Sequence, residues 1–94
     1  MTSSKVVSKE EERLRAVLPL LTPREASACA LVAKGKTNKE IATQLGGISA
    51  RTVEADLRGA RRILSARLGN RVLQSREFAV LCSQIATGQK TRLP

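Results

Sequence analysis

Arginine side chains are the groups in this sequence best suited to contacts with a charged partner. Five of them lie between residues 49 and 70: Arg51, Arg58, Arg61, Arg62 and Arg67. Glu54 and Asp56 are the acidic residues of the same segment. A guanidinium is planar and forms paired hydrogen bonds with a phosphate or with O6 and N7 of guanine. The segment therefore favours contacts with nucleic acid, and a solvated charged helix face is the alternative interpretation.

The sequence contains few residues suited to catalysis or to metal binding. The sequence contains no His, which excludes Ser-His-Asp and Cys-His nucleophile systems and removes the commonest metal ligand. Cys29 and Cys82 lie far apart without CxxC spacing, among apolar neighbours. We expect both thiols to be small buried hydrophobic groups. The sequence predicts a protein that is not an enzyme, with no catalytic residue, no metal ligand and no cofactor.

The balance of charge points to an acidic partner. The 94 residues hold 17 Lys and Arg against 8 Asp and Glu, a formal net charge of +9. Nucleic acid is the first candidate and an anionic membrane surface the second. One Phe, with no Trp or Tyr, leaves too few rings to stack single-stranded bases. Neither a signal peptide nor an apolar run of about 18 residues is present, so we expect a cytoplasmic protein without membrane attachment.

These side chains must be positioned by helices, because Ala, Leu, Arg, Lys and Glu dominate and alternating β-branched runs are absent. Paired capping residues mark the helix starts at Ser8, Thr22 and Thr37, and Ser49 is a further cap. Pro19, Gly35, Gly46-Gly47 and Leu68-Gly69-Asn70 interrupt the pattern. The expected helices cover about residues 8–18, 22–35, 37–45, 49–68 and 72–86.

Apolar spacing indicates which faces pack together. Val53, Leu57, Ala60 and Leu64 form one continuous stripe on the helix that follows Ser49. The last helix has more apolar positions than one stripe can hold: Val72, Leu73, Phe78, Val80, Leu81, Cys82 and Ile85. The surplus predicts either a dimer interface or a deeply buried closing helix.

Two helices joined by a glycine turn, the second longer and rich in arginine, form a helix-turn-helix pattern. In this pattern one face of the second helix packs on the protein and the opposite face enters a major groove about 12 Å wide. The residues also resemble the LuxR/FixJ-type (GerE-like) DNA-binding domain, over about residues 21–86. The resemblance is carried by Leu21–Glu25, Leu31–Gly35, Thr37–Ala42, Ser49, Arg51-Thr52-Val53 and Leu57.

This resemblance implies an all-α, four-helix helix-turn-helix bundle, here with an additional N-terminal helix. It also implies that the protein binds duplex DNA and regulates transcription, commonly as a dimer through the last helix. Base-reading positions correspond to Glu54, Ala55 and Arg58. The expected contacts to the DNA backbone are Thr37, Asn38, Lys39, Arg51 and Thr52, to which we add Arg61 and Arg62. The expected homodimer interface comprises Phe78, Leu81, Cys82 and Ile85.

Three departures distinguish this sequence from the family pattern. Glu54 and Asp56 stand where relatives usually have a non-acidic residue and His or Tyr, respectively. Glu54 either accepts a hydrogen bond from N4 of cytosine or pairs with Arg58 at i, i+4, and the two roles are compatible. The turn holds two glycines where one residue is usual. The stretch from Arg61 to Leu68 is about one helical turn longer, which keeps the same face inward.

We therefore expect an N-terminal extension with a short helix (1–20), a LuxR-type domain (21–87) and a flexible tail (88–94). No sensor domain fits in the 20 residues ahead of the resemblance, so a stand-alone, sequence-specific regulator is expected. Compactness without a large activating surface favours repression. The alternative is a module that binds a transcription factor or polymerase subunit, and the acidic pair Glu54 and Asp56 favours it.

Overall fold

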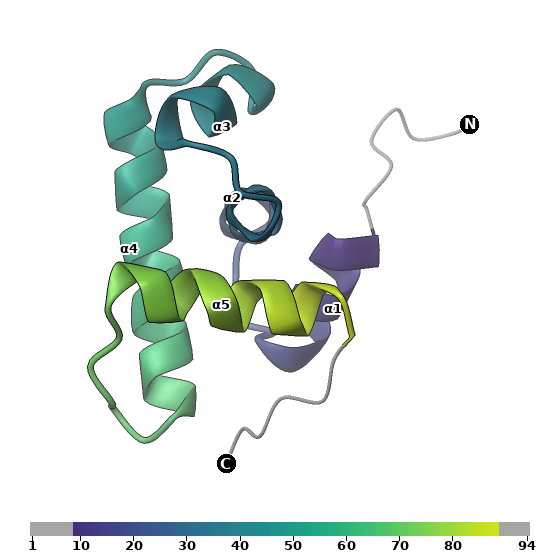
Figure 1. Cartoon of the computed structure of the whole chain (residues 1–94), viewed down its shortest axis with the longest axis vertical. Coiled ribbons are helices and arrows are strands. Elements are labelled where there is room, and N and C mark those ends of the chain that lie inside the picture. Colours follow the sequence, from purple (N-terminus) through teal and green to yellow (C-terminus); the bar gives the residue numbers. More distant parts are fainter. Residues whose placement is uncertain (1–8, 89–94) are drawn as a thin grey trace.

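The computed structural model describes residues 9–88, and the regular structure within them is entirely α-helical. The helices are α1 (Lys9–Val17), α2 (Pro23–Ala33), α3 (Asn38–Gln44), α4 (Ala50–Arg67) and α5 (Ser75–Ala86) (Figure 1). The predicted fold class is thus confirmed. The proposed cap at Ser8 and residues 89–94 of the expected flexible tail lie outside the described residues.

Side-chain caps fix where three helices begin. The Thr22 hydroxyl accepts the Glu25 N–H at 3.1 Å, and the Glu25 carboxylate accepts the Thr22 N–H at 2.9 Å. Thr37 and Glu40 repeat this reciprocal arrangement at the start of α3. Ser49 accepts the Thr52 N–H at 3.1 Å at the start of α4. Each cap satisfies backbone donors that the first helical turn leaves unpaired.

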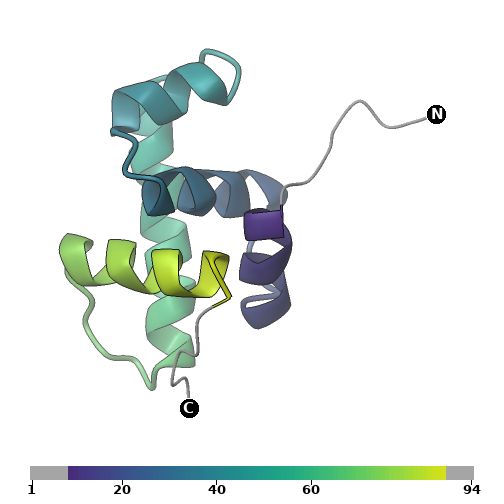
Figure 2. The ribbon, with the colours of Figure 1, turned by 45° about the vertical axis from the view of Figure 1, so that its right-hand side comes forward.

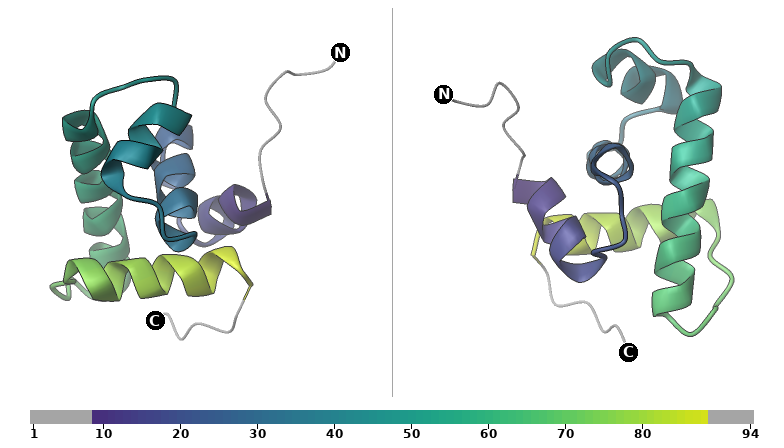
Figure 3. Two further views of the ribbon diagram at one scale, coloured as in Figure 1. Left: turned by 45° about the horizontal axis from the view of Figure 1, so that its top comes forward. Right: turned by 180° about the vertical axis from the view of Figure 1, so that it is seen from behind.

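Helix α2 runs through the middle of the bundle and contacts the other four helices. Helices α1 and α4 lie on opposite sides of it, and α5 crosses both α1 and α2 (Figures 1 and 3). Helix α3 packs beside the first half of α4, forming a corner away from α1 (Figure 2). This corner is the helix-turn-helix, and its turn holds Gly46 at φ +98° and Gly47 at φ +82°. Such left-handed conformations favour glycine.

The inward face of α4 is the predicted one. Val53, Ala60 and Leu64 are at most 1% exposed, and Leu57 is also buried. This stripe packs into a core that includes Leu21 from the connection before α2 and Cys29, Ile41 and Phe78 from other helices. Because the buried stripe fixes the rotation of α4 about its axis, it also determines which residues of α4 face away from the protein.

Helix α1 is part of this core. Leu14 and Leu18 are 0% and 3% exposed. Arg13 donates from Nη1 to the Ala86 carbonyl at 3.0 Å, placing a cation at the C-terminal end of α5, where the helix dipole is negative. The Ser27 hydroxyl donates to the Glu11 carboxylate at 2.8 Å, which ties α1 to α2. The extension therefore packs against α2 and α5 as a fifth helix of one bundle.

The predicted start of the last helix was wrong by three residues. We expected Val72 to begin it, whereas α5 begins at Ser75. Gly69 and Asn70, both with positive φ, end α4 and turn the chain. In the connection that follows, Leu73 is 4% exposed while Val72 is 85% exposed. Two of the apolar residues that we assigned to the last helix, Val72 and Leu73, thus lie in this connection and not in α5.

Cys29 of α2 and Cys82 of α5 are free and buried, as expected for small hydrophobic groups. Hydrogen bonding to Cys82, together with burial, raises the pKa of the Cys29 thiol well above its ordinary range. Above about pH 8.5 an unfolded chain releases this proton while the folded chain retains it. The unfolded state then binds fewer protons, so the free energy of unfolding decreases as pH rises.

We expect the free energy of unfolding to fall between about pH 8 and 10, at up to about 1.4 kcal/mol per pH unit, as measured by urea denaturation. Tyr and His are absent, so neither contributes to this slope. Cys29→Ala is the control, and its slope should be shallower. An equal slope in the two proteins would assign the effect to other groups.

Candidate nucleic-acid interface

The outward face of α4 presents a row of charged and small side chains. Its exposed residues include Arg51, Glu54, Ala55, Arg58 and Arg62. Their spacing of three and four residues keeps them on one side of the helix, opposite the buried stripe. The three base-reading candidates of the sequence, Glu54, Ala55 and Arg58, thus lie together on the solvent side of α4.

The starts of α3 and α4 contribute the second group of candidates. Thr37 and Lys39 are exposed at the start of α3, and Asn38 is half-buried. Hydrogen bonds from the backbone N–H and side chain of Thr37 lower the pKa of Glu40, which keeps the cap charged. At the start of α4, Thr52 is half-buried and its hydroxyl lies 2.9 Å from that of Ser49. These positions combine polar side chains with helix N-termini, which attract phosphate.

Asp56 does not belong to the outward face. Its carboxylate is 11% exposed and contacts Arg24 of α2, with Nε to Oδ2 at 2.7 Å and a hydrogen bond from Nη2 to Oδ1 at 3.1 Å. The Nε contact is an ion pair without hydrogen-bond geometry, since Oδ2 has no hydrogen-bond partner. Asp56 therefore links α4 to α2, and only Glu54 remains as an acidic side chain beside the outward arginines of α4.

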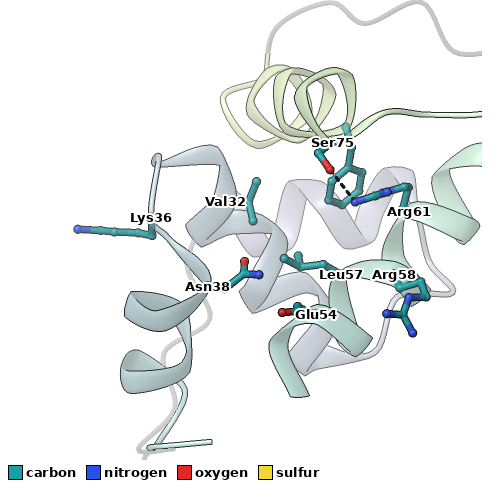
Figure 4. A pocket seen from close by; sticks show the side chains of 9 residues that line it. Val32, Lys36, Asn38, Glu54, Leu57, Arg58, Arg61 and Ser75 are labelled. Carbon is teal, nitrogen blue, oxygen red and sulfur yellow. Dashed lines mark hydrogen bonds between the residues drawn. The ribbon is translucent and has the colours of Figure 1, made fainter. Parts of the chain in front are cut away.

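Glu54 and Arg58 are not paired with each other. No ion pair joins these two side chains, both of which lie in the described part of the chain. Figure 4 shows the Glu54 carboxylate directed toward Asn38 at the start of α3, whereas Arg58 points away from it. The i, i+4 pair that the sequence suggested is absent from this structure. Both charged groups are thus available to a ligand on this face.

Arg61 was expected among the backbone contacts, but its side chain turns toward α5. It donates from Nη2 to the Ser75 hydroxyl at 3.2 Å, and its guanidinium carbon lies 5.6 Å from the centre of the Phe78 ring. Arg61 is half-buried, whereas Arg62 is exposed. Arg62 thus remains on the outer surface, and Arg61 lies between α4 and α5.

The expected dimer residues are mostly inside the protein. Phe78, Cys82 and Ile85 are each at most 4% exposed and pack in the core of their own chain. Leu81 is half-buried, and the neighbouring Val80 is 49% exposed. The apolar surface that α5 leaves outward therefore consists of Val80 and part of Leu81, because its other large apolar side chains close the core.

Sequence reasoning missed the inward contacts of Asp56 and Arg61. A signal was present, because each lies three or four residues from members of the buried stripe. Asp56 follows Val53 by three residues, and Arg61 precedes Leu64 by three. Polar residues at such flanking positions contact the helices that cover the stripe. Their partners, Arg24 and Ser75, are distant in sequence and were not predictable from local spacing.

Comparisons with known proteins add one positive finding. The sequence profile of the family described as "Bacterial regulatory proteins, luxR family" matches residues 19–67. That range contains α2, α3 and α4, and therefore the whole helix-turn-helix. No match was found among curated proteins or among solved structures. Among the helices of residues 9–88, none is both long and apolar enough to cross a bilayer.

Proposed function

Because the chain belongs to the luxR family of bacterial regulatory proteins, we propose that it binds double-stranded DNA sequence-specifically and regulates transcription. In this proposal α4 enters the major groove. The observation that carries it is the division of α4 into a buried aliphatic stripe and an outward face with Arg51, Arg58 and Arg62. A helix of 18 residues is about 27 Å long, enough to lie along a groove and present several turns to the base edges.

Each group of candidates has a separate role. Arg58 donates paired hydrogen bonds to guanine, Glu54 accepts from N4 of cytosine, and Ala55 allows close approach of the helix. Thr37, Asn38, Lys39, Arg51, Thr52 and Arg62 contact the sugar-phosphate backbone and set the orientation of α4. The net positive charge of the chain supports such contacts.

We also propose that two copies bind together through the outward part of α5. Val80 and Leu81 supply its apolar centre, replacing the buried residues that the sequence suggested. A two-fold dimer presents two copies of α4 to half-sites related by the same symmetry. A site bound in this way is blocked to other proteins, which favours repression.

The position of Asp56 weakens the alternative that the protein is a module for binding a transcription factor or polymerase subunit. It relied on two acidic residues facing the same partner, and Asp56 pairs with Arg24 inside the bundle. An interface rich in exposed arginine is better suited to contact the negatively charged DNA backbone than to contact a basic surface on another protein. We therefore retain DNA binding as the proposed function.

Selection of bound duplexes from a random pool tests this function directly. We expect enrichment of one motif and its retention in a mobility shift at about 150 mM salt, where weak non-specific complexes dissociate. A palindromic motif would support the dimer as well. Failure to enrich any motif, with the protein folded and monodisperse, would contradict the proposal.

Lys39→Ala should weaken binding to all duplexes by a similar factor, because Lys39 is assigned to a phosphate. The slope of log affinity against log salt should become shallower by about one unit. Lys9→Ala is the matched control: it removes the same charge from α1, on the far side of the bundle from α4 (Figure 1). Fluorescence anisotropy over a salt series measures both slopes. If the salt-dependence slope decreases equally in the two variants, Lys39 makes no specific contact with the DNA.

A further inference from the structure

A hollow of about 400 Å³ lies beside the outward face of α4, where four helices meet. Residues from the end of α2, the start of α3, the middle of α4 and the first turn of α5 line it (Figure 4). Val32, Leu57 and Phe78 supply its apolar surface. The volume lies in the range of small-ligand sites, and the other lining residues are polar or charged.

Arg61, which lines this hollow, has one hydrogen-bond donor without a partner. Its Nη2 is hydrogen-bonded to Ser75, but its Nε is buried and has no hydrogen-bond partner. Within the described part of the chain, no carboxylate forms an ion pair with it. Because the Arg61 side chain is half-buried and has no counter-anion among these residues, a bound oxyanion can accept charge-assisted hydrogen bonds from it. In Figure 4 the Arg61 side chain extends into the hollow, while Lys36 and Arg58 point outward at its edge.

The first turn of α5 supplies a second, independent attraction for an anion. Gln74 occupies the N-cap position, and its side chain makes no capping hydrogen bond. The N–H groups of the first turn therefore lack a side-chain acceptor, and the positive end of the helix dipole is uncapped. Glu77, the acidic residue of this turn, is paired with Arg71. Ser75, which begins α5, lines the hollow with its hydroxyl bonded to Arg61.

We propose that Arg61, Ser75 and the first turn of α5 bind a phosphate group. A tetrahedral oxyanion can accept hydrogen bonds from several directions, here from the guanidinium, the hydroxyl and the backbone N–H groups. Lys36 and Arg58 add positive charge at the edge of the hollow, against the one carboxylate of Glu54.

The phosphate has two chemical sources. One is a phosphodiester of the duplex, since Glu54 and Arg58 belong both to the hollow and to the outward face of α4; this source rests on the proposed function. The other is a small phosphorylated molecule, which binds without DNA and competes with it. Both present the same oxyanion to Arg61.

Nuclear magnetic resonance of the full ¹⁵N-labelled chain separates these sources. One titration uses inorganic phosphate against chloride at constant ionic strength, and the other uses a duplex carrying the selected motif. We expect saturable shifts of the Arg76, Glu77 and Phe78 amide signals in at least one titration. Arg61→Met and Ser75→Ala should each weaken that response, Arg61→Met by at least about tenfold, because it removes a charge-assisted hydrogen bond.

Matched variants control for general effects. Arg67→Met removes an exposed arginine from the same helix, and Ser83→Ala removes a hydroxyl two turns further along α5; neither should change the response. Ser75 is exposed, so Ser75→Ala remains informative if Arg61→Met fails to fold. Shifts with inorganic phosphate support the small-molecule source, even if no duplex binds. Shifts with the duplex alone support the phosphodiester. Absence of both responses in the folded protein overturns the proposal.

Discussion

Replacing Leu14 by alanine should destabilise the whole domain, although Leu14 lies outside the segment that matches the family. Its side chain is 0% exposed between α1 and the rest of the core. Removing a buried leucine side chain leaves a cavity and costs about 2–5 kcal/mol. A domain of this size has about 5–10 kcal/mol of total stability, so the expected loss is a large fraction. Urea denaturation followed by circular dichroism gives the change in the free energy of unfolding.

Leu20→Ala is the matched control, because Leu20 is 78% exposed in the connection after α1. The same substitution there should change stability by less than about 0.5 kcal/mol. If Leu14→Ala were equally mild, α1 would be an appendage that detaches without affecting the bundle. A single cooperative transition with a reduced midpoint is the outcome that places α1 in the folding unit.

Arg58→Ala should have the largest effect on sequence recognition. Arg58 is exposed on the outward face of α4 and has no ion-pair partner among the described residues, so its full hydrogen-bonding capacity is available to a base. Loss of paired hydrogen bonds to guanine should cost about 1–3 kcal/mol and relax the preference at one base pair. Binding titrations against the selected motif and its single-base variants measure both quantities.

Two further variants define what the loss means. Arg67→Ala removes a guanidinium from the last turn of α4 and should not change which base is preferred. Glu54→Gln should relax the preference at a different base pair, because Glu54 and Arg58 are not joined in the protein. Should the Arg58 and Glu54 variants relax the same base pair, the two side chains would act as one unit on the DNA.

The helices and their caps were largely predictable because their causes are local. Thr22 with Glu25 and Thr37 with Glu40 act within one helical turn, and the stripe from Val53 to Leu64 follows from helical periodicity alone. The start of α5 was predicted less well, because Leu73 is buried by a tertiary contact and does not belong to a helical apolar stripe. Its burial comes from a turn at Gly69 and Asn70 that brings an extended segment against the core.

The candidate site was predictable in outline only. The outward positions of Glu54, Ala55 and Arg58 follow once the buried stripe is known. The directions of Asp56 and Arg61 depend on Arg24, Ser75 and Phe78, which the fold brings from other helices. Local spacing carries no information about such partners, and for that reason the hollow beside α4 could not be found before the helices were placed.

Because the two thiols are buried between α2 and α5, their chemical reactivity can be used to measure how often the bundle opens. A reagent such as a maleimide can modify Cys29 or Cys82 only when these helices separate, because each residue is 1% exposed. The rate of modification therefore measures how often the bundle opens. Slower modification in the presence of a ligand would reveal stabilisation of the closed bundle without any added fluorophore.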